Sequence, residues 1–125
     1  MTGLLEDIPR FVTANPAVVS SAGESEVTTA QFCFGEDFIG FRGHFPGNPV
    51  LPGIAQIMLA QYTATRGRSG QLARVVKCKF TSNIKPLDNV EVQTTATSTE
   101  GASRYKATVT ANGTRCATMV FDLEY

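Results

Sequence analysis

The sequence predicts an α+β domain in which an antiparallel sheet wraps around one long central helix. Several runs alternate apolar and polar residues, as half-buried strands do, and one run from Leu51 to Arg66 is apolar nearly all round, as a buried helix is. Such a helix cannot lie on a flat sheet with one side in water. The sheet must therefore curl around it, or a second chain must cover it, and we expect both.

The composition is that of an ordinary globular protein. The 125 residues suit a single domain spanning residues 1–125. Hydrophobic residues make up 42% of the chain, and eleven basic side chains balance eleven acidic ones, so nucleic-acid binding is not indicated. No stretch reaches the roughly 18 consecutive apolar residues of a membrane span, and the amino terminus is acidic, unlike a signal peptide. We expect a cytoplasmic protein that contacts no membrane.

The three cysteines give no sign of a metal site. Cys33, Cys78 and Cys116 lie in separate strand-like runs, without a C-x-x-C pair, and the chain contains a single histidine. That spacing is not typical of zinc ligands, so we expect no metal. We interpret the three residues as buried free thiols, which fits a reducing compartment.

The amino-terminal third contains one predicted helix and one predicted strand. Apolar residues from Gly3 to Val12 recur at helical spacing and predict a short amphipathic helix or turn. After a polar loop around Ala22 to Ser25, the run from Glu26 to Phe34 alternates and predicts a strand. Its apolar side comprises Ala30, Phe32 and Phe34. The loop from Gly35 to Phe41 then leads to the histidine, His44.

The long helix has recognisable ends. Pro52 suits a first helical turn, where the N–H that proline lacks has no partner to lose. The stretch from Arg66 to Gly70 contains two glycines and two arginines and ends the helix.

The rest of the chain predicts four strands. They cover Leu72 to Phe80, Val90 to Thr97, Arg104 to Ala111 and a last strand that includes Ala117 to Leu123. The inward positions of the first of them are predicted to be Val76, Cys78 and Phe80. A loop with Pro86, Asp88 and Asn89 separates the first two strands, and the pair Asn112-Gly113 predicts a tight hairpin turn between the last two.

The segment from Gly43 to Gly53 is the candidate functional site. Three prolines and three glycines in these eleven residues make a rigid, sharply turned path, because proline fixes φ and glycine admits conformations that other residues avoid. His44 opens this path, and the buried helix follows it without a gap.

This segment carries a family resemblance. The run Gly43-His44-Phe45-Pro46-Gly47, then Pro49-Val50, then Pro52-Gly53 opening an apolar helix resembles the signature of the 3-hydroxyacyl-[acyl-carrier-protein] dehydratases of fatty acid synthesis. The resemblance extends from about Val27 to Tyr125. It implies a hotdog fold, a dimer whose sheets join edge to edge, and active sites at the dimer interface. We expect a homodimer, with a heterodimer containing a related, acid-bearing subunit as the alternative.

The resemblance also implies a reaction. Members remove water from a 3-hydroxyacyl thioester, carried by the phosphopantetheine arm of an acyl carrier protein or by coenzyme A, and give the trans-2-enoyl thioester. No other cofactor is implied. His44, with an ordinary pKa near 6.5, is the expected base beside the thioester carbonyl. The backbone amides of Gly53 and Ile54, at the positive end of the helix dipole, are expected to hold the carbonyl oxygen. Phe45 and Pro52 are expected to contact the substrate.

The family's helix acid is missing. The corresponding position is Met58, and a register shifted by one places Ile57 there instead. No aspartate or glutamate occurs from Gly43 to Leu87, and loss of a positioned acid or base costs roughly 10²- to 10⁴-fold in rate. Met58 is expected to pack along an acyl tunnel.

Three interpretations of the missing acid stay open. Gln56, Gln61, Tyr62 or a water near Met58 assists the departing hydroxyl, or a related subunit supplies the acid. Alternatively, the protein binds or processes acyl thioesters by another route, as thioesterase-like or non-catalytic hotdog proteins do. Gln61 is kept as a candidate substrate contact.

A carrier protein is acidic, and basic residues follow the helix. They are Arg66, Arg68, Arg74, Lys77, Lys79 and Lys85. These residues could dock the carrier, although alternating lysines are also typical of a solvated strand face.

Overall fold

A computed structural model describes residues 7–22, 25–38, 50–66, 70–99 and 102–124 of the chain. His44 and Phe45 lie outside the described residues. The elements, in chain order, are the 3₁₀-helix η1 (Ile8–Phe11), β1 (Val12–Ala22), β2 (Ser25–Cys33), α2 (Gly53–Thr65), β3 (Gln71–Phe80), β4 (Asn89–Thr99), β5 (Ala102–Ala111) and β6 (Thr114–Glu124).

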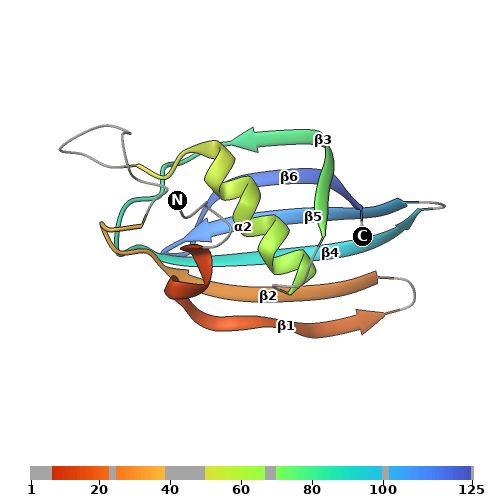
Figure 1. The fold of residues 1–125 in the computed structure, drawn as a ribbon, viewed down its shortest axis with the longest axis horizontal. Helices are drawn as coiled ribbons and strands as arrows, with labels where there is room; N and C mark the ends of the chain where they lie inside the picture. The colour runs from red at the N-terminus through yellow and green to blue at the C-terminus, as the bar shows by residue number, and fades with distance from the viewer. Residues whose placement is uncertain (1–6, 23–24, 39–49, 67–69, 100–101, 125) are drawn as a thin grey trace.

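The strands form one antiparallel sheet, and α2 lies across one of its faces (Figure 1). The strand order is β1-β2-β4-β5-β6-β3, so that β1 and β3 are the two edges. The predicted α+β architecture, with one helix embraced by an antiparallel sheet, is confirmed. The helix packs mainly against the middle of the sheet, and β3 bends before it runs along β6 as the edge of the sheet (Figure 1).

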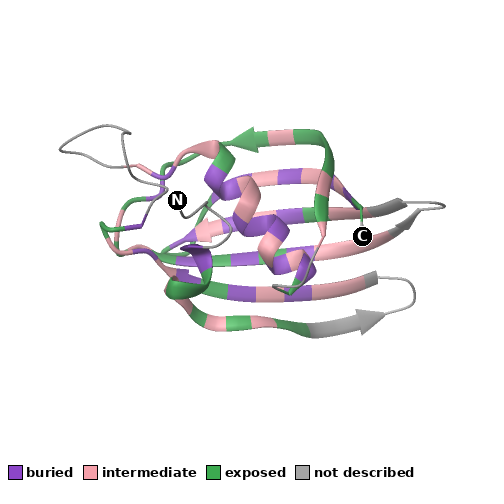
Figure 2. Ribbon diagram, viewed as in Figure 1, coloured by how far each residue is buried: buried purple, intermediate pink, exposed green. Residues whose placement is uncertain are grey.

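The core lies between α2 and the concave face of the sheet. Strand register places inward residues in rows across the sheet; one row comprises Ala30, Val92, Val109 and Ala117. All four are at most 1% exposed. On the helix, Ala55, Leu59 and Ala60 face this layer and are buried, as Figure 2 shows by the purple side of α2. The alternation read from β2, β4, β5 and β6 therefore identifies the core face correctly.

The ends of α2 follow from its sequence. Pro52 is the N-cap, with an extended backbone, so the helix begins one residue later than a proline inside the first turn would place it. At the other end Arg66 adopts the left-handed conformation, and its N–H donates to the carbonyl oxygens of Tyr62 and Thr63. This αL cap ends the helix at Thr65.

Strand β1 was not predicted from the sequence. Its pairing with β2 has three register irregularities, and Pro16 interrupts its alternation, which only an edge strand tolerates. Of the short helix or turn predicted from Gly3 to Val12, the described residues show the single 3₁₀ turn of η1.

Strand β3 differs from its predicted pattern. A register shift between Val75 and Lys77 places Val75, rather than Val76, opposite the inward residue Phe121. The inward direction predicted for Val76 is therefore wrong, whereas Cys78 and Phe80 pair with the inward residues Met119 and Ala117, as predicted, although Phe80 is 46% exposed. Because β3 is an edge strand beyond the main contact of α2, its inward side is only partly covered.

The cysteines are free thiols, as predicted, but only Cys116 is buried. Cys33 and Cys78 are half-buried. Burial raises the pKa of the Cys78 and Cys116 thiols, which keeps both in the protonated, less nucleophilic form at neutral pH.

Two turns place residues at positive φ. Asn112 (φ 51°) and Gly113 (φ 84°) form the predicted β5–β6 hairpin turn, and both residue types suit it. Leu87, between β3 and β4, has φ 70° and is 69% exposed. A leucine is strained in this conformation, and its side chain gains little from packing there.

Leu87→Gly is therefore expected to stabilise the protein. Relief of the left-handed strain, about 1–2 kcal/mol, exceeds the extra chain entropy that glycine loses on folding, roughly 0.5–1 kcal/mol. Urea unfolding should show a higher midpoint, by up to about 1 kcal/mol in free energy. Gly113→Ala, at a similar φ, should instead destabilise. A lower midpoint for Leu87→Gly would show that its side chain makes a stabilising contact.

Candidate active site

The amino-terminal end of α2 presents two unengaged backbone donors. The amides of Ala55 and Gln56 donate to the Pro52 carbonyl, at 3.1 and 3.2 Å. Within the described part of the chain, the amides of Gly53 and Ile54 have no hydrogen-bond acceptor. Ile54 is 51% exposed, so this helix end is open on one side. The positive end of the helix dipole and two free N–H groups are suited to an anionic or carbonyl oxygen.

Gly53 is in close contact with Phe80. A Cβ built on Gly53 would lie 2.8 Å from Cζ and 2.9 Å from Cε2 of the Phe80 ring, which is closer than real contacts allow. The absence of a side chain at this position lets the ring from the end of β3 lie against the first residue of the helix. The ring is thus part of the wall beside the open amides.

Met58 and Ile57 both pack against the core. Each is half-buried and touches the buried cluster between α2 and the sheet. Both positions that the sequence offers for a helix acid therefore hold apolar packing residues, neither of which can donate a proton.

The two glutamines of α2 have different environments. Gln61 is buried, and its Nε2 donates to the Gly70 carbonyl at 3.0 Å, which ties the end of α2 to the start of β3. Gln56 is 3% exposed; its Nε2 lies 3.5 Å from the Leu51 carbonyl, and its Oε1 is buried with no hydrogen-bond partner. The sequence did not distinguish their bonding.

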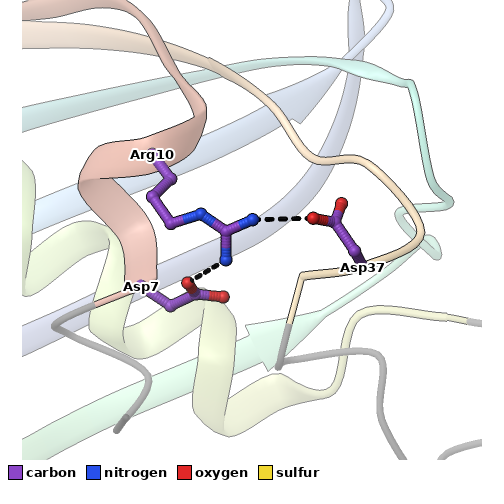
Figure 3. A network of polar contacts seen from close by, with 3 residues as sticks. All are labelled: Asp7, Arg10 and Asp37. Carbon is purple, nitrogen blue, oxygen red and sulfur yellow. Dashed lines mark hydrogen bonds and ion pairs between the residues drawn. The ribbon is translucent and has the colours of Figure 1, made fainter.

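The described residues on either side of the segment that carries His44 are anchored by contacts that the sequence did not indicate. Arg10 donates to Asp7 (2.6 Å) and to Asp37 (2.7 Å), joining η1 to the loop after β2 (Figure 3). The buried ring of Phe38 stacks on Phe34, with 4.4 Å between centroids. After the segment, the Leu51 amide donates to the Ile84 carbonyl at 2.8 Å.

The basic residues predicted to dock a carrier protein lie in different parts of the structure. Lys77 and Lys79 of β3 lie with Lys106 of β5 around a hollow of about 460 Å³ on the outer face of the sheet, and no acidic side chain lines it. The register explains the grouping, because Val120 of β6 pairs with both Lys77 and Lys106. Lys106 was missed because it is distant in sequence and only the pairing of β5 with β6 brings it near β3.

The other predicted basic residues do not line this hollow. Arg74 pairs in register with Asp122, whose carboxylate accepts two hydrogen bonds from Arg104, at 2.7 and 3.0 Å. These bonds lower the pKa of Asp122. Arg66 is at the helix end and Lys85 on the β3–β4 loop, and Arg68 lies outside the described residues.

No helix in the described ranges is long and apolar enough to cross a membrane. Within those same ranges, no group of three or more histidine, cysteine, aspartate or glutamate side chains is arranged to hold a metal ion.

A family model shows to which family the chain belongs. The model of the ApeI-like family, described as ApeI dehydratase, matches residues 20–119. The protein belongs to the ApeI-like dehydratase family. Curated relatives named 3-hydroxyacyl-[acyl-carrier-protein] dehydratase FabZ are similar to this member. The protein from Lactobacillus helveticus is 33% identical over 82 residues, which cover 58% of this chain and 54% of the relative.

Another curated relative of the same name, from Alkaliphilus metalliredigens, is 32% identical over 97 residues, covering 69% of this chain and 65% of the relative. The ApeI-like chain thus spans about half to two thirds of the length of these relatives.

Solved structures show that the ApeI-like protein has the hotdog fold. One is similar with a TM-score of 0.67 and 18% identity, covering 88% of this chain and 98% of the other: "The Dehydratase Heterocomplex ApeI:P from Xenorhabdus doucetiae". A putative thioesterase, yhdA from Lactococcus lactis, is similar with a TM-score of 0.74 and 12% identity, covering 98% and 96%. Dehydratase and thioesterase names thus both occur among proteins of this shape, so the fold alone does not decide the reaction.

The contact between Gly53 and Phe80 can be tested by a double-mutant cycle. Gly53→Ala should displace the ring, because the new methyl group has no room beside Cζ. In a Phe80→Ala background the same change should be more favourable by roughly 0.5 to 1 kcal/mol, the coupling typical of residues in contact. Urea unfolding of the four proteins measures this energy. Additive effects would contradict the close contact.

Proposed function

We propose that this ApeI-like protein dehydrates 3-hydroxyacyl thioesters to trans-2-enoyl thioesters, with His44 as the base and the amides of Gly53 and Ile54 binding the thioester carbonyl. The open amino-terminal end of α2 carries this proposal, because it follows directly on the motif that contains His44. Family membership supports a dehydratase-type enzyme. Phe45, Pro52, Met58 and Gln61 complete the proposed substrate contacts.

The proposed chemistry assigns each group one task. His44 takes the proton next to the thioester carbonyl, and negative charge then develops on the carbonyl oxygen. Preorganised N–H donors at the start of α2 stabilise that charge. The hydroxyl group at C3 leaves with a proton, which Met58 cannot give. The proton must therefore come from water, from Tyr62 on the same helix or from a group outside this helix, and the rate of the isolated chain should be low.

The assay uses purified protein and a 3-hydroxyacyl carrier-protein thioester, with formation of the enoyl product measured. His44→Ala should lower the rate at least about 100-fold, as loss of a general base does. Met58→Glu should raise it, because a carboxyl group would return to the family's position. Equal rates for wild type and His44→Ala would contradict autonomous dehydration, and release of free carrier thiol instead would indicate a thioesterase.

A second candidate is a subunit of a mixed dimer that receives its acid from a related chain. Two observations favour it: no carboxylate lies between Gly43 and Leu87, and the edge strand β3 exposes Val75, Val76 and Phe80. The similar Xenorhabdus doucetiae structure is titled a heterocomplex. Strand pairing along β3 would cover this edge. In that case this chain has no dehydratase activity alone and becomes active when it is mixed with the acid-bearing subunit. His44→Ala in this chain should abolish that gain in activity.

The hollow ringed by Lys77, Lys79 and Lys106 is the proposed contact for an acidic acyl carrier protein. The three ammonium groups belong to no described ion pair, and no carboxylate lines the hollow to neutralise them. Complementary charge of this kind accelerates encounter more than it tightens the complex.

Replacing all three lysines by glutamate should therefore lower kcat/KM for the carrier-bound substrate about tenfold or more. The kcat/KM of this variant should also depend less on salt concentration than that of wild type. The rate with the same acyl group on free pantetheine should not change. Arg115→Glu, an exposed arginine of β6 outside the hollow, is the matched control. An equal loss with both substrates would show that the lysines act on the site or the fold instead.

A further inference from the structure

One polar atom in the interior lacks a partner. In the described part of the chain, Oε1 of Gln56 is the buried side-chain nitrogen or oxygen that has no hydrogen bond. Leaving such a group unsatisfied costs about 1–3 kcal/mol, and native proteins keep few of them. The other buried polar side chains of α2 are bonded: Thr63 to the Leu59 carbonyl, Thr65 to that of Tyr62 and Gln61 to that of Gly70. Gln56 is the exception on this helix.

The orientation of the Gln56 amide is determined by its neighbour. Nε2 faces the Leu51 carbonyl, and exchanging the two ends of the amide would bring two oxygens together. The oxygen is therefore the free end, and it needs a donor. The amide lies next to the backbone that leads into α2, so its free oxygen is in the first turn of the helix.

Gln56 and Gly53 share one side of that turn, because residues three apart on a helix are neighbours. The helix end thus combines two kinds of polar group. Gly53 and Ile54 offer donors for an oxygen, and Gln56 offers an acceptor for a hydroxyl or N–H. A 3-hydroxyacyl thioester has the matching pair, because its carbonyl oxygen accepts and its C3 hydroxyl donates, and only two carbon–carbon bonds separate the carbons that bear them.

We propose that Oε1 of Gln56 accepts the hydrogen bond of the substrate's C3 hydroxyl and thereby selects hydroxylated acyl thioesters. The inference rests on the proposed function and adds the residue that distinguishes substrate from other acyl chains. The neutral amide binds and orients the hydroxyl and transfers no proton. It therefore does not replace the missing acid at Met58. A site built to pair a hydroxyl rejects ligands that lack it, because its own polar atom is then left unpaired.

The experiment compares two ligands of equal chain length, a 3-hydroxyacyl pantetheine thioester and the saturated acyl thioester, by titration calorimetry with the full chain. Wild type should bind the hydroxylated ligand about tenfold more tightly, which corresponds to about 1.4 kcal/mol. Gln56→Leu should lose this preference while keeping its affinity for the saturated ligand. It should also unfold at a urea concentration at least as high as wild type, because no buried polar atom remains.

Thr63→Val is the matched control, since it removes a buried, already bonded polar group two turns along the same helix. It should keep the preference for the hydroxylated ligand. If Gln56→Leu does not fold, Gln56→Met serves in its place.

A preference that persists in the Gln56 variant overturns the inference. Equal binding of both ligands by wild type also overturns it, and indicates that a buried water satisfies Oε1, while the proposed thioester site stands. Binding of neither ligand to wild type overturns the proposed function, and the inference with it.

Discussion

An apolar helix must be shielded from water, and in this protein the burial of α2 determines how the other elements are arranged. The sheet buries Ala55, Leu59 and Ala60 on one side of the helix. At the amino-terminal end Ile54 is exposed, and the amides of Gly53 and Ile54 have no acceptor among the described residues. The candidate site is thus the place where the packing of the helix is incomplete, and there a ligand can reach a helix end held by a rigid core.

The parts of the fold that the sequence predicted well are those whose side chains face two distinct environments. Strands β2, β4, β5 and β6 each have one face on the core and one toward water, so their alternation is clean and predicted the strands, and the apolar side of β2 (Ala30, Phe32 and Phe34) was identified correctly. The edge strands lack this contrast. Strand β1 contains Pro16 and pairs irregularly with β2, so the sequence did not predict it. In β3 the register shift makes Val75, rather than Val76, the residue opposite the core. A bulge changes side-chain direction without a signal in the residue pattern.

The candidate site also has parts that could be predicted from the sequence and parts that could not. The motif from Gly43 to Gly53 is contiguous, so the helix end and its donors could be predicted from the sequence. Contacts between distant segments could not: Phe80 against Gly53, the joining of η1 to the loop after β2 by Arg10, and Lys106 beside Lys77 all depend on tertiary pairing. The difference between Gln56 and Gln61 also required coordinates, since it depends on which carbonyl each amide reaches.

The edge strand β3 has a consequence for the behaviour of the protein in concentrated solution. An edge with exposed valines is a template for adding strands of other chains, which leads to aggregation when the proper neighbour is absent. Lys77 and Lys79 belong to this same strand, with their side chains over the outer face of the sheet, and charged side chains on an edge strand oppose indiscriminate stacking because each added strand must desolvate them. The two lysines thus disfavour a disordered succession of copies along this edge.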